Sequence, residues 1–159
     1  MPAPLAPVRP VSIIGVGSCL GAPIFGPAAG PRILKDLGLD AQLRSRGIPA
    51  RWQSLHEPSA PKPPRASLPE RLANVSALLH DLADEVAALC TDGTVPLVLG
   101  GDHAIGAGTW RGAARALEGR GKLGLIWIDA HLDSHTPQTS HSGNIHGMPL
   151  ASLLGIGDA

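Results

Sequence analysis

Five of the seven histidines lie in the stretch from His103 to His146, and three acidic or imidazole side chains alternate within it: Asp129, His131 and Asp133. These three follow an apolar run directly. In extended backbone, side chains two positions apart share a face, so the three are expected to project together. Two carboxylates and an imidazole beside a buried strand end would be strongly penalised by desolvation unless a cation lay among them. The pattern therefore predicts a bound divalent metal ion.

A fourth predicted ligand, His103, follows the pair Gly100–Gly101. Glycines allow a sharp turn at a strand end and a close approach of His103 to the site. Carboxylate and imidazole donors without a thiolate suit Mn²⁺, Fe²⁺ or Zn²⁺ better than Ca²⁺. The alternative interpretation is that these are ordinary polar loop residues, with His131 hydrogen-bonded and Asp102 capping the next helix.

The elements that must position these residues alternate between apolar runs and helical patterns. Strands are predicted over residues 11–17, 51–55, 95–99 and 123–128, and helices over residues 31–37, 67–91, 105–118 and 148–154. The longest helix begins at Ser67 with Glu70 three residues later, the spacing of a capping box. This alternation predicts an α/β fold, in which a mostly parallel sheet is covered by helices on both faces. Ligands of such folds bind beyond the carboxyl ends of the strands, where His103 and Asp129 lie.

Length and composition place the chain among globular proteins of ordinary domain size. It has 159 residues, of which 43% are hydrophobic and 16% charged. We expect a Pro-rich tail over residues 1–10, one partial domain over residues 11–159, and a surface loop over residues 57–65. The two cysteines, Cys19 and Cys90, lie outside any close-spaced pattern, which favours a reducing, cytoplasmic setting.

Charge and hydropathy exclude several classes of partner. Lys plus Arg and Asp plus Glu each number 13, so no global field attracts nucleic acid or an anionic membrane. No apolar stretch reaches the roughly 20 residues that cross a bilayer. We therefore predict no nucleic acid and no membrane partner, and a small molecule as the ligand.

Neutral hydrogen-bonding side chains crowd the segment after the acidic motif. They are Thr139, Ser140, Ser142, Asn144 and His146. An imidazole such as that of His146 can act as a general acid or base near pH 7. The alternatives are that residues 142–144 form a plain surface turn and that His146 is a structural histidine.

Three segments together resemble consecutive signatures of the ureohydrolases, the superfamily of arginases, agmatinases and related guanidino hydrolases. The segments are Gly100–His103, Asp129–Asp133 and Ser142–Pro149. The first two are similar to signatures shared across the superfamily. The third, with Thr136 and Pro137 before it, is closer to arginases than to agmatinases. The resemblance implies a three-layer α-β-α, arginase-like fold.

The resemblance also implies a binuclear manganese centre, whose bridging hydroxide attacks the guanidinium carbon of L-arginine to give urea and ornithine. By this resemblance, His103, Asp129 and Asp133 would bind one Mn²⁺, while Asp129 and His131 would bind the other. Two ions about 3.5–4 Å apart lower the pKa of a water shared between them. His146 would move a proton during the reaction.

The substrate end of the site carries one departure from the arginase pattern. Ser142 and Asn144 match residues that hold the α-carboxylate and α-amino end of the substrate, whereas His135 stands where arginases usually have an asparagine. An agmatinase or guanidino-acid hydrolase is therefore the enzymatic alternative.

The resemblance covers only the first half of the family pattern. Members are about twice as long, and their second halves supply an Asp-x-Asp motif and a glutamate. Only ten residues follow Pro149, and the last glutamate is Glu118. We therefore expect a chain truncated to the N-terminal half of the fold, which alone holds one ion or none and has little or no activity. The alternative from another class is an inactive fragment or an interaction module that completes its sheet against a partner chain. A homo-oligomer is a further expectation.

Overall fold

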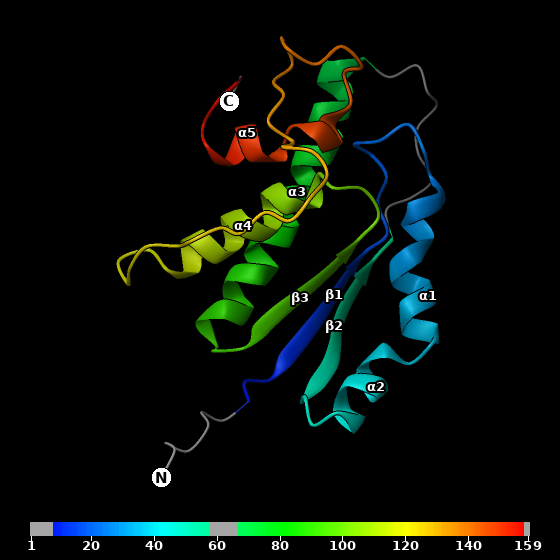
Figure 1. The fold of residues 1–159 in the computed structure, drawn as a ribbon, viewed down its shortest axis with the longest axis vertical. Coiled ribbons are helices and arrows are strands. Elements are labelled where there is room, and N and C mark those ends of the chain that lie inside the picture. The colour runs from blue at the N-terminus through cyan, green and yellow to red at the C-terminus, as the bar shows by residue number, and fades with distance from the viewer. Residues whose placement is uncertain (1–7, 58–66, 158–159) are drawn as a thin grey trace.

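The computed structural model describes residues 8–57 and 67–157. Three strands, β1 (Val11–Val16), β2 (Ala50–His56) and β3 (Val95–Gly100), form a parallel sheet in the order β2-β1-β3 (Figure 1). Residues 1–7, which are most of the predicted tail, and residues 58–66, which include most of the loop predicted over 57–65, lie outside the described residues. The same holds for residues 158–159.

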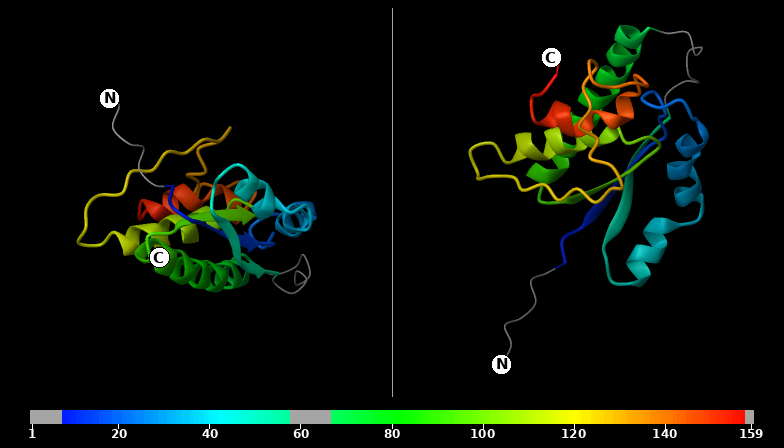
Figure 2. Two further views of the ribbon diagram at one scale, coloured as in Figure 1. Left: turned by 90° about the horizontal axis from the view of Figure 1, so that it is seen from below. Right: turned by 45° about the horizontal axis from the view of Figure 1, so that its top comes forward.

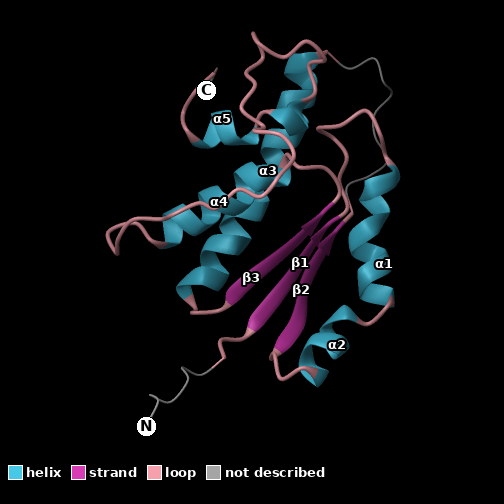
Figure 3. Ribbon diagram, in the orientation of Figure 1, coloured by secondary structure: helices cyan, strands magenta, loops and turns pink. Residues whose placement is uncertain are grey.

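Helices lie on both faces of this sheet, which confirms the predicted three-layer α/β class. Figure 3 shows the sheet between a pair of short helices, α1 (Gly30–Asp36) and α2 (Leu39–Ser45), and a pair of longer ones, α3 (Leu68–Thr91) and α4 (Ile105–Ala116). The second view in Figure 2 shows the same three layers with the top of the molecule turned forward. Of these helices, α2 was not predicted.

The central strand β1 carries the core because its alternate side chains face the two layers. Ile14 and Val16 are fully buried and pack in one cluster with Leu82, Val86 and Leu89 of α3. Gly15 faces the other layer, where a Cβ would lie 3.0 Å from the Cβ of Pro31 in α1. The strand is therefore enclosed from both sides, as expected for a parallel sheet.

The long helix α3 begins as predicted. The Ser67 hydroxyl accepts from the Glu70 backbone N–H, and the Glu70 carboxylate accepts from the Ser67 N–H at 2.8 Å, which completes the capping box. Helix α4 packs directly on α3 because glycines face it. A Cβ at Gly112 would lie 2.5 Å from the Ala83 carbonyl oxygen, and one at Gly108 would lie 2.8 Å from that of Leu79.

The predicted fourth strand over residues 123–128 is wrong. The segment is an irregular loop that pairs with no strand, and Ile126 and Ile128 are 82% and 93% exposed. A strand forms only where a neighbour satisfies its backbone N–H and C=O groups. Among the described residues, β3 pairs with β1 alone, so this apolar segment has no partner.

The remaining described elements are short. They are the 3-10 turns η1 (Gly26–Ala29) and η2 (Ile145–Gly147) and the helix α5 (Pro149–Leu153), which matches the predicted helix over residues 148–154. No helix in the described part of the chain combines the length and the apolar composition needed to cross a membrane.

Candidate metal centre

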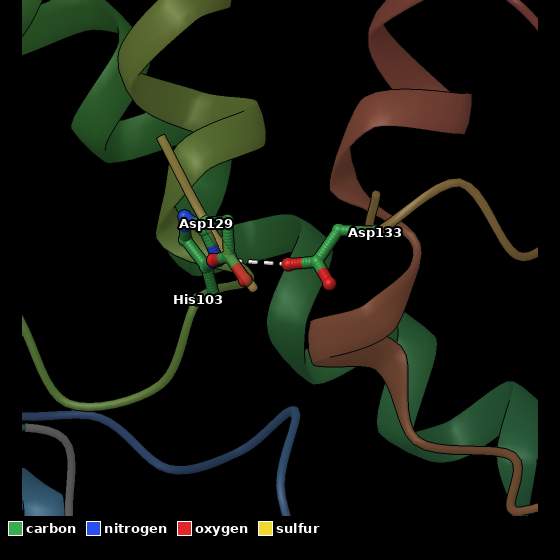
Figure 4. Close-up of side chains that lie close together, drawn as sticks. All are labelled: His103, Asp129 and Asp133. Atoms are coloured by element: carbon green, nitrogen blue, oxygen red, sulfur yellow. Dashed lines mark ion pairs between the residues drawn. The ribbon is translucent and has the colours of Figure 1, made fainter. Parts of the chain in front are cut away.

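Three of the four predicted ligands converge at the carboxyl end of β3. The Nδ1 atom of His103 lies 3.0 Å from Asp129 Oδ2 and 2.7 Å from Asp133 Oδ2 (Figure 4). One donor atom from each side chain lies within 4.8 Å of the other two. Two carboxylates and one imidazole, with no thiolate, form a donor set that fits a hard or intermediate divalent cation such as Mn²⁺.

His103 is held in place by the buried carboxylate that precedes it. Asp102 accepts hydrogen bonds from the backbone N–H groups of Gly21 and Ala104, each at 2.9 Å. Burial raises the pKa of Asp102, and these two hydrogen bonds oppose the rise. Through these two hydrogen bonds, Asp102 connects the loop after β1 to the start of α4. His103 lies between Asp102 and Ala104 in the sequence and is therefore held at this connection.

The glycine turn before Asp102 is tight, as its sequence predicts. A Cβ at Gly101 would overlap the backbone oxygen of Ser18, and a Cβ at Gly100 would overlap the side chain of Ile105. The Asp102 N–H also donates to the Ser18 carbonyl oxygen at 2.9 Å. The strand end therefore lies directly against the loop after β1, and this fixes where α4 starts.

Trp127 stacks on His103, a contact that sequence reasoning missed. The two ring centroids are 4.7 Å apart with an interplanar angle of 21°. Its indole also lies against α4, where a Cβ at Gly106 would lie 3.1 Å from the ring. Trp127 Nε1 is buried and has no hydrogen-bond partner among the described residues. The only signal in the sequence was a bulky aromatic two positions before Asp129, inside the run that was interpreted as a strand.

His131 does not join the cluster, contrary to the expected common face of residues 129, 131 and 133. Its backbone N–H donates to Asp129 Oδ1 at 2.8 Å, and its Nδ1 lies 3.4 Å from the same oxygen. The imidazole itself is 82% exposed. The pKa of Asp129 is lowered, chiefly by that backbone hydrogen bond. His131 therefore lies beside Asp129 but on its solvent side.

The physical reason is that the backbone here is not extended. Asp133 has φ of 50°, in the left-handed region that aspartate tolerates better than most residues. Its carbonyl oxygen accepts from the Leu150 N–H at 2.9 Å, at the start of α5. The turn directs the Asp133 carboxylate towards His103, and the side chain is only 10% exposed.

The predicted proton-transferring residue, His146, lies in η2 and is half-buried. Its backbone N–H donates to the Gly21 carbonyl oxygen at 3.1 Å. The Gly21 N–H donates to Asp102, and the Gly21 C=O accepts from the His146 N–H, so one residue of the loop after β1 links the turn that carries His103 to η2.

The predicted substrate residues lie on one loop, outside the three-residue cluster. Asn144 N–H donates to Ser142 Oγ at 3.3 Å, and the exposed His135 places its Nδ1 3.3 Å from Thr139 Oγ1. A second missed residue, Arg71 at the start of α3, donates to the Gly143 carbonyl oxygen at 2.9 Å. The separation of 72 residues between these partners gave no local sequence signal.

A parallel α/β fold with a carboxylate and imidazole cluster beyond a strand's carboxyl end defines a class of protein, the α/β proteins with a candidate metal site at the edge of the sheet. Within that class this chain belongs to the Arginase family, whose sequence profile matches residues 9–158.

Individual relatives agree with this assignment. The chain is 40% identical to the arginase of Bacillus caldovelox over 162 aligned residues, which cover 94% of this chain and 50% of that protein. It is 35% identical to human Arginase-1, with 92% and 45% covered. The crystal structure of Entamoeba histolytica arginase in complex with L-ornithine superposes with a TM-score of 0.85 at 32% identity, with 96% and 52% covered. The chain thus spans about half the length of the relatives it matches.

Proposed function

We propose that this chain forms the metal-binding wall of an arginase-type ureohydrolase, which hydrolyses L-arginine to ornithine and urea. The observation that carries the proposal is the convergence of His103, Asp129 and Asp133 in a member of the Arginase family. A charged cluster of this composition at a strand end is costly unless it binds a cation or a charged substrate.

The residues present fit a manganese centre in part. His103, Asp129 and Asp133 would hold one Mn²⁺, and Asp129 with the neighbouring His131 would contribute to a second. When bound, such ions supply a nucleophilic hydroxide near neutral pH by lowering the pKa of water. Trp127 would keep the His103 ring in one orientation, since aromatic stacking restricts its rotation.

The substrate end of the site would be formed by the loop after Asp133. Ser142 and Asn144 would hold the α-carboxylate and α-amino groups, and His146 would accept or donate a proton near pH 7. The ornithine complex of the Entamoeba histolytica enzyme supports an amino acid as the ligand of that relative. His135 is exposed on the same loop. Because it stands where arginases usually have an asparagine, agmatine or a guanidino acid is the alternative substrate.

Two metal ions need more donors than these four residues supply, so we expect little or no turnover from the chain alone. Which guanidino compound is the substrate can be tested in a chimaera. In it, residues 9–158 replace the matching half of Bacillus caldovelox arginase, and urea release is followed with Mn²⁺ and L-arginine, agmatine or 4-guanidinobutyrate.

The expected result is turnover with L-arginine that Asp129→Asn lowers at least about 1,000-fold, because the change removes several kcal/mol of metal-dependent stabilisation. Asp92→Asn makes the same change at an exposed aspartate after α3, away from the site, and serves as the control that should keep its rate. Preferential turnover of agmatine would support the alternative substrate. Absence of urea from every substrate would reject the proposed function.

A further inference from the structure

A fixed positive charge lies against the loop on which the proposed function places the amino-acid end of the substrate. Arg71, near the start of α3, donates from Nη2 to the Gly143 carbonyl oxygen at 2.9 Å. Gly143 stands between Ser142 and Asn144, the two residues proposed to hold that end. Arg71 is only half-buried, so its guanidinium is accessible to a solute as well as to the loop.

The loop packs against the same part of α3, and this packing fixes the position of Arg71 relative to the loop. The buried Ile145 lies in one apolar cluster with Val75, one helical turn after Arg71. The Gly143 N–H donates to Ser140 Oγ at 3.0 Å, within a turn where Gly143 has φ of 65°. The Gly143 carbonyl oxygen is therefore directed towards α3, and Arg71 is held beside the two residues that flank Gly143.

The guanidinium of Arg71 has unused hydrogen-bond donors. An arginine side chain carries five N–H donors in a planar fork whose geometry matches a carboxylate. The bond to Gly143 uses one of them, and Arg71 makes no other hydrogen bond or ion pair with the described residues. The adjacent carboxylate, that of Glu70, accepts from the N–H and the hydroxyl of Ser67 at 2.8 and 2.9 Å. The remaining donors of Arg71 are therefore open to a ligand carboxylate.

The two ends of the candidate site also differ in charge. At the metal end, donor atoms of His103, Asp129 and Asp133 lie within 4.8 Å of one another. At the loop end, residues 134–149 include no acidic side chain, and Arg71 adds a positive charge. A ligand with a cationic group at one end and a carboxylate at the other complements both ends. Agmatine carries a cation at each end, and its ammonium group would be repelled by Arg71.

We propose that Arg71 binds the carboxylate of the substrate and thereby determines which guanidino compound this site accepts. The ligand would be a guanidino carboxylate, such as L-arginine or 4-guanidinobutyrate, and agmatine would be excluded. This inference rests on the proposed function, which supplies the position of the amino-acid end. Ser142 and Asn144 provide neutral hydrogen-bonding groups, which can bind carboxylates and amines alike, whereas a charge-assisted hydrogen bond from Arg71 favours the carboxylate.

The test measures the binding of L-arginine and of agmatine, which differ only in the carboxylate, to the full chain by isothermal titration calorimetry. Metal-free buffer is used, so neither Mn²⁺ binding nor catalysis affects the outcome. Arg71→Gln removes the charge, and Arg71→Lys keeps it. Arg46→Gln makes the same change at an exposed arginine after α2 and is the matched control. Circular dichroism and melting temperature check that each variant is folded.

The unsubstituted chain and Arg46→Gln should bind L-arginine at least about tenfold more tightly than agmatine, the factor that a hydrogen bond between charged groups supplies. Arg71→Gln should weaken the binding of L-arginine about tenfold and leave that of agmatine within about twofold, and Arg71→Lys should retain about a threefold preference. Equal losses for both ligands would show that Arg71 only holds the loop and would overturn the proposal. So would an unchanged preference in Arg71→Gln, or no binding of L-arginine to the unsubstituted chain.

Failure of the proposed function can be told apart from failure of this inference. The function is tested by urea release from the chimaera, whereas the role of Arg71 is tested by binding alone. An L-arginine preference that depends on Arg71 would support this inference even if the chimaera released no urea. Urea release together with a preference that is independent of Arg71 would reject this inference and leave the proposed function standing.

Discussion

Two six-residue apolar runs of this chain have similar compositions and opposite fates. Residues 11–16, Val-Ser-Ile-Ile-Gly-Val, form the central strand, with Ile13 and Ile14 fully buried. Residues 123–128, Leu-Gly-Leu-Ile-Trp-Ile, form a loop, with Ile126 and Ile128 almost fully exposed. The first run has a strand on each side and helices on both faces. The second has no strand beside it among the described residues and touches α4 through Trp127. The difference shows that an apolar sequence allows a strand to form, but that neighbouring strands and helices determine whether it does.

The candidate metal centre lies across the boundary between these two regions. His103 comes from the packed region, where Asp102 and the tight glycine turn fix it. Asp129 and Asp133 come from the loop region, which contacts the packed region through Trp127, Gly143 and His146. Substitutions in the packed region should therefore lower the free energy of unfolding strongly, and substitutions in the loop region should lower it only weakly.

The largest effect is expected at the centre of the packed region. Ile14→Ala removes buried methyl groups that pack against Leu82 and Val86, and it should lower the free energy of unfolding by about 2–5 kcal/mol. Urea denaturation followed by circular dichroism measures the change. A loss below about 1 kcal/mol would mean that β1 is not the core strand.

A smaller loss of stability is expected at the turn that carries His103, the first of the proposed metal ligands. Asp102→Ala leaves the buried N–H groups of Gly21 and Ala104 without their acceptor. It should lower the free energy of unfolding by about 2 kcal/mol, because the loss of these bonds is partly offset when a carboxylate no longer has to be buried. Asp92→Ala, at an exposed aspartate after α3, is the matched control in the same denaturation experiment. Equal stability of the two variants would show that Asp102 does not position the turn.

At the junction of the two regions, a local effect is expected. Arg71→Ala deletes the hydrogen bond to the Gly143 carbonyl oxygen, worth about 1 kcal/mol, and frees the loop that carries Ser142 and Asn144. Hydrogen exchange should accelerate over residues 140–147 while the amides of β1 keep their protection. The exposed Arg46→Ala serves as control, and an unchanged loop in Arg71→Ala would contradict this tether.

The smallest effect is expected in the apolar loop. Ile128→Ala in the chain alone should change the free energy of unfolding by no more than about 0.5 kcal/mol, because the side chain is 93% exposed. The same chemical change at Ile14 and Ile128 thus tests the comparison directly. A loss of 2 kcal/mol at Ile128 would show that residues 123–128 are packed after all.

Much of the fold was predictable because its determinants are local. The capping box at Ser67 and Glu70, the apolar stripe of α3 and the glycines after β3 each act within a few residues, and the corresponding elements form where expected. The prediction of a strand at residues 123–128 was wrong because a strand needs a neighbouring strand, and the local pattern of apolar residues does not show whether one is present. Helix α2 was missed, although Gly38, with φ of 72°, leads directly into it.

The candidate site was predictable to a similar degree. Residue type and spacing identified His103, Asp129 and Asp133, which converge. The same spacing placed His131 on their face, but the chain bends over residues 129–131 and the imidazole lies on the solvent side of Asp129. The contacts of Trp127 and Arg71 join positions far apart in the chain, so only the three-dimensional arrangement shows them.

The central claim, that His103, Asp129 and Asp133 bind a divalent cation, is tested most directly by titrating Mn²⁺ into the purified chain and measuring free Mn²⁺ by electron paramagnetic resonance. We predict saturable binding of one ion per chain, weakened about tenfold or more by Asp133→Asn and unchanged by His141→Asn, since loss of even an outer partner of a ligand costs about tenfold or more. Binding that is absent, or that is equal in the two variants, would contradict the assignment of this cluster as the metal centre.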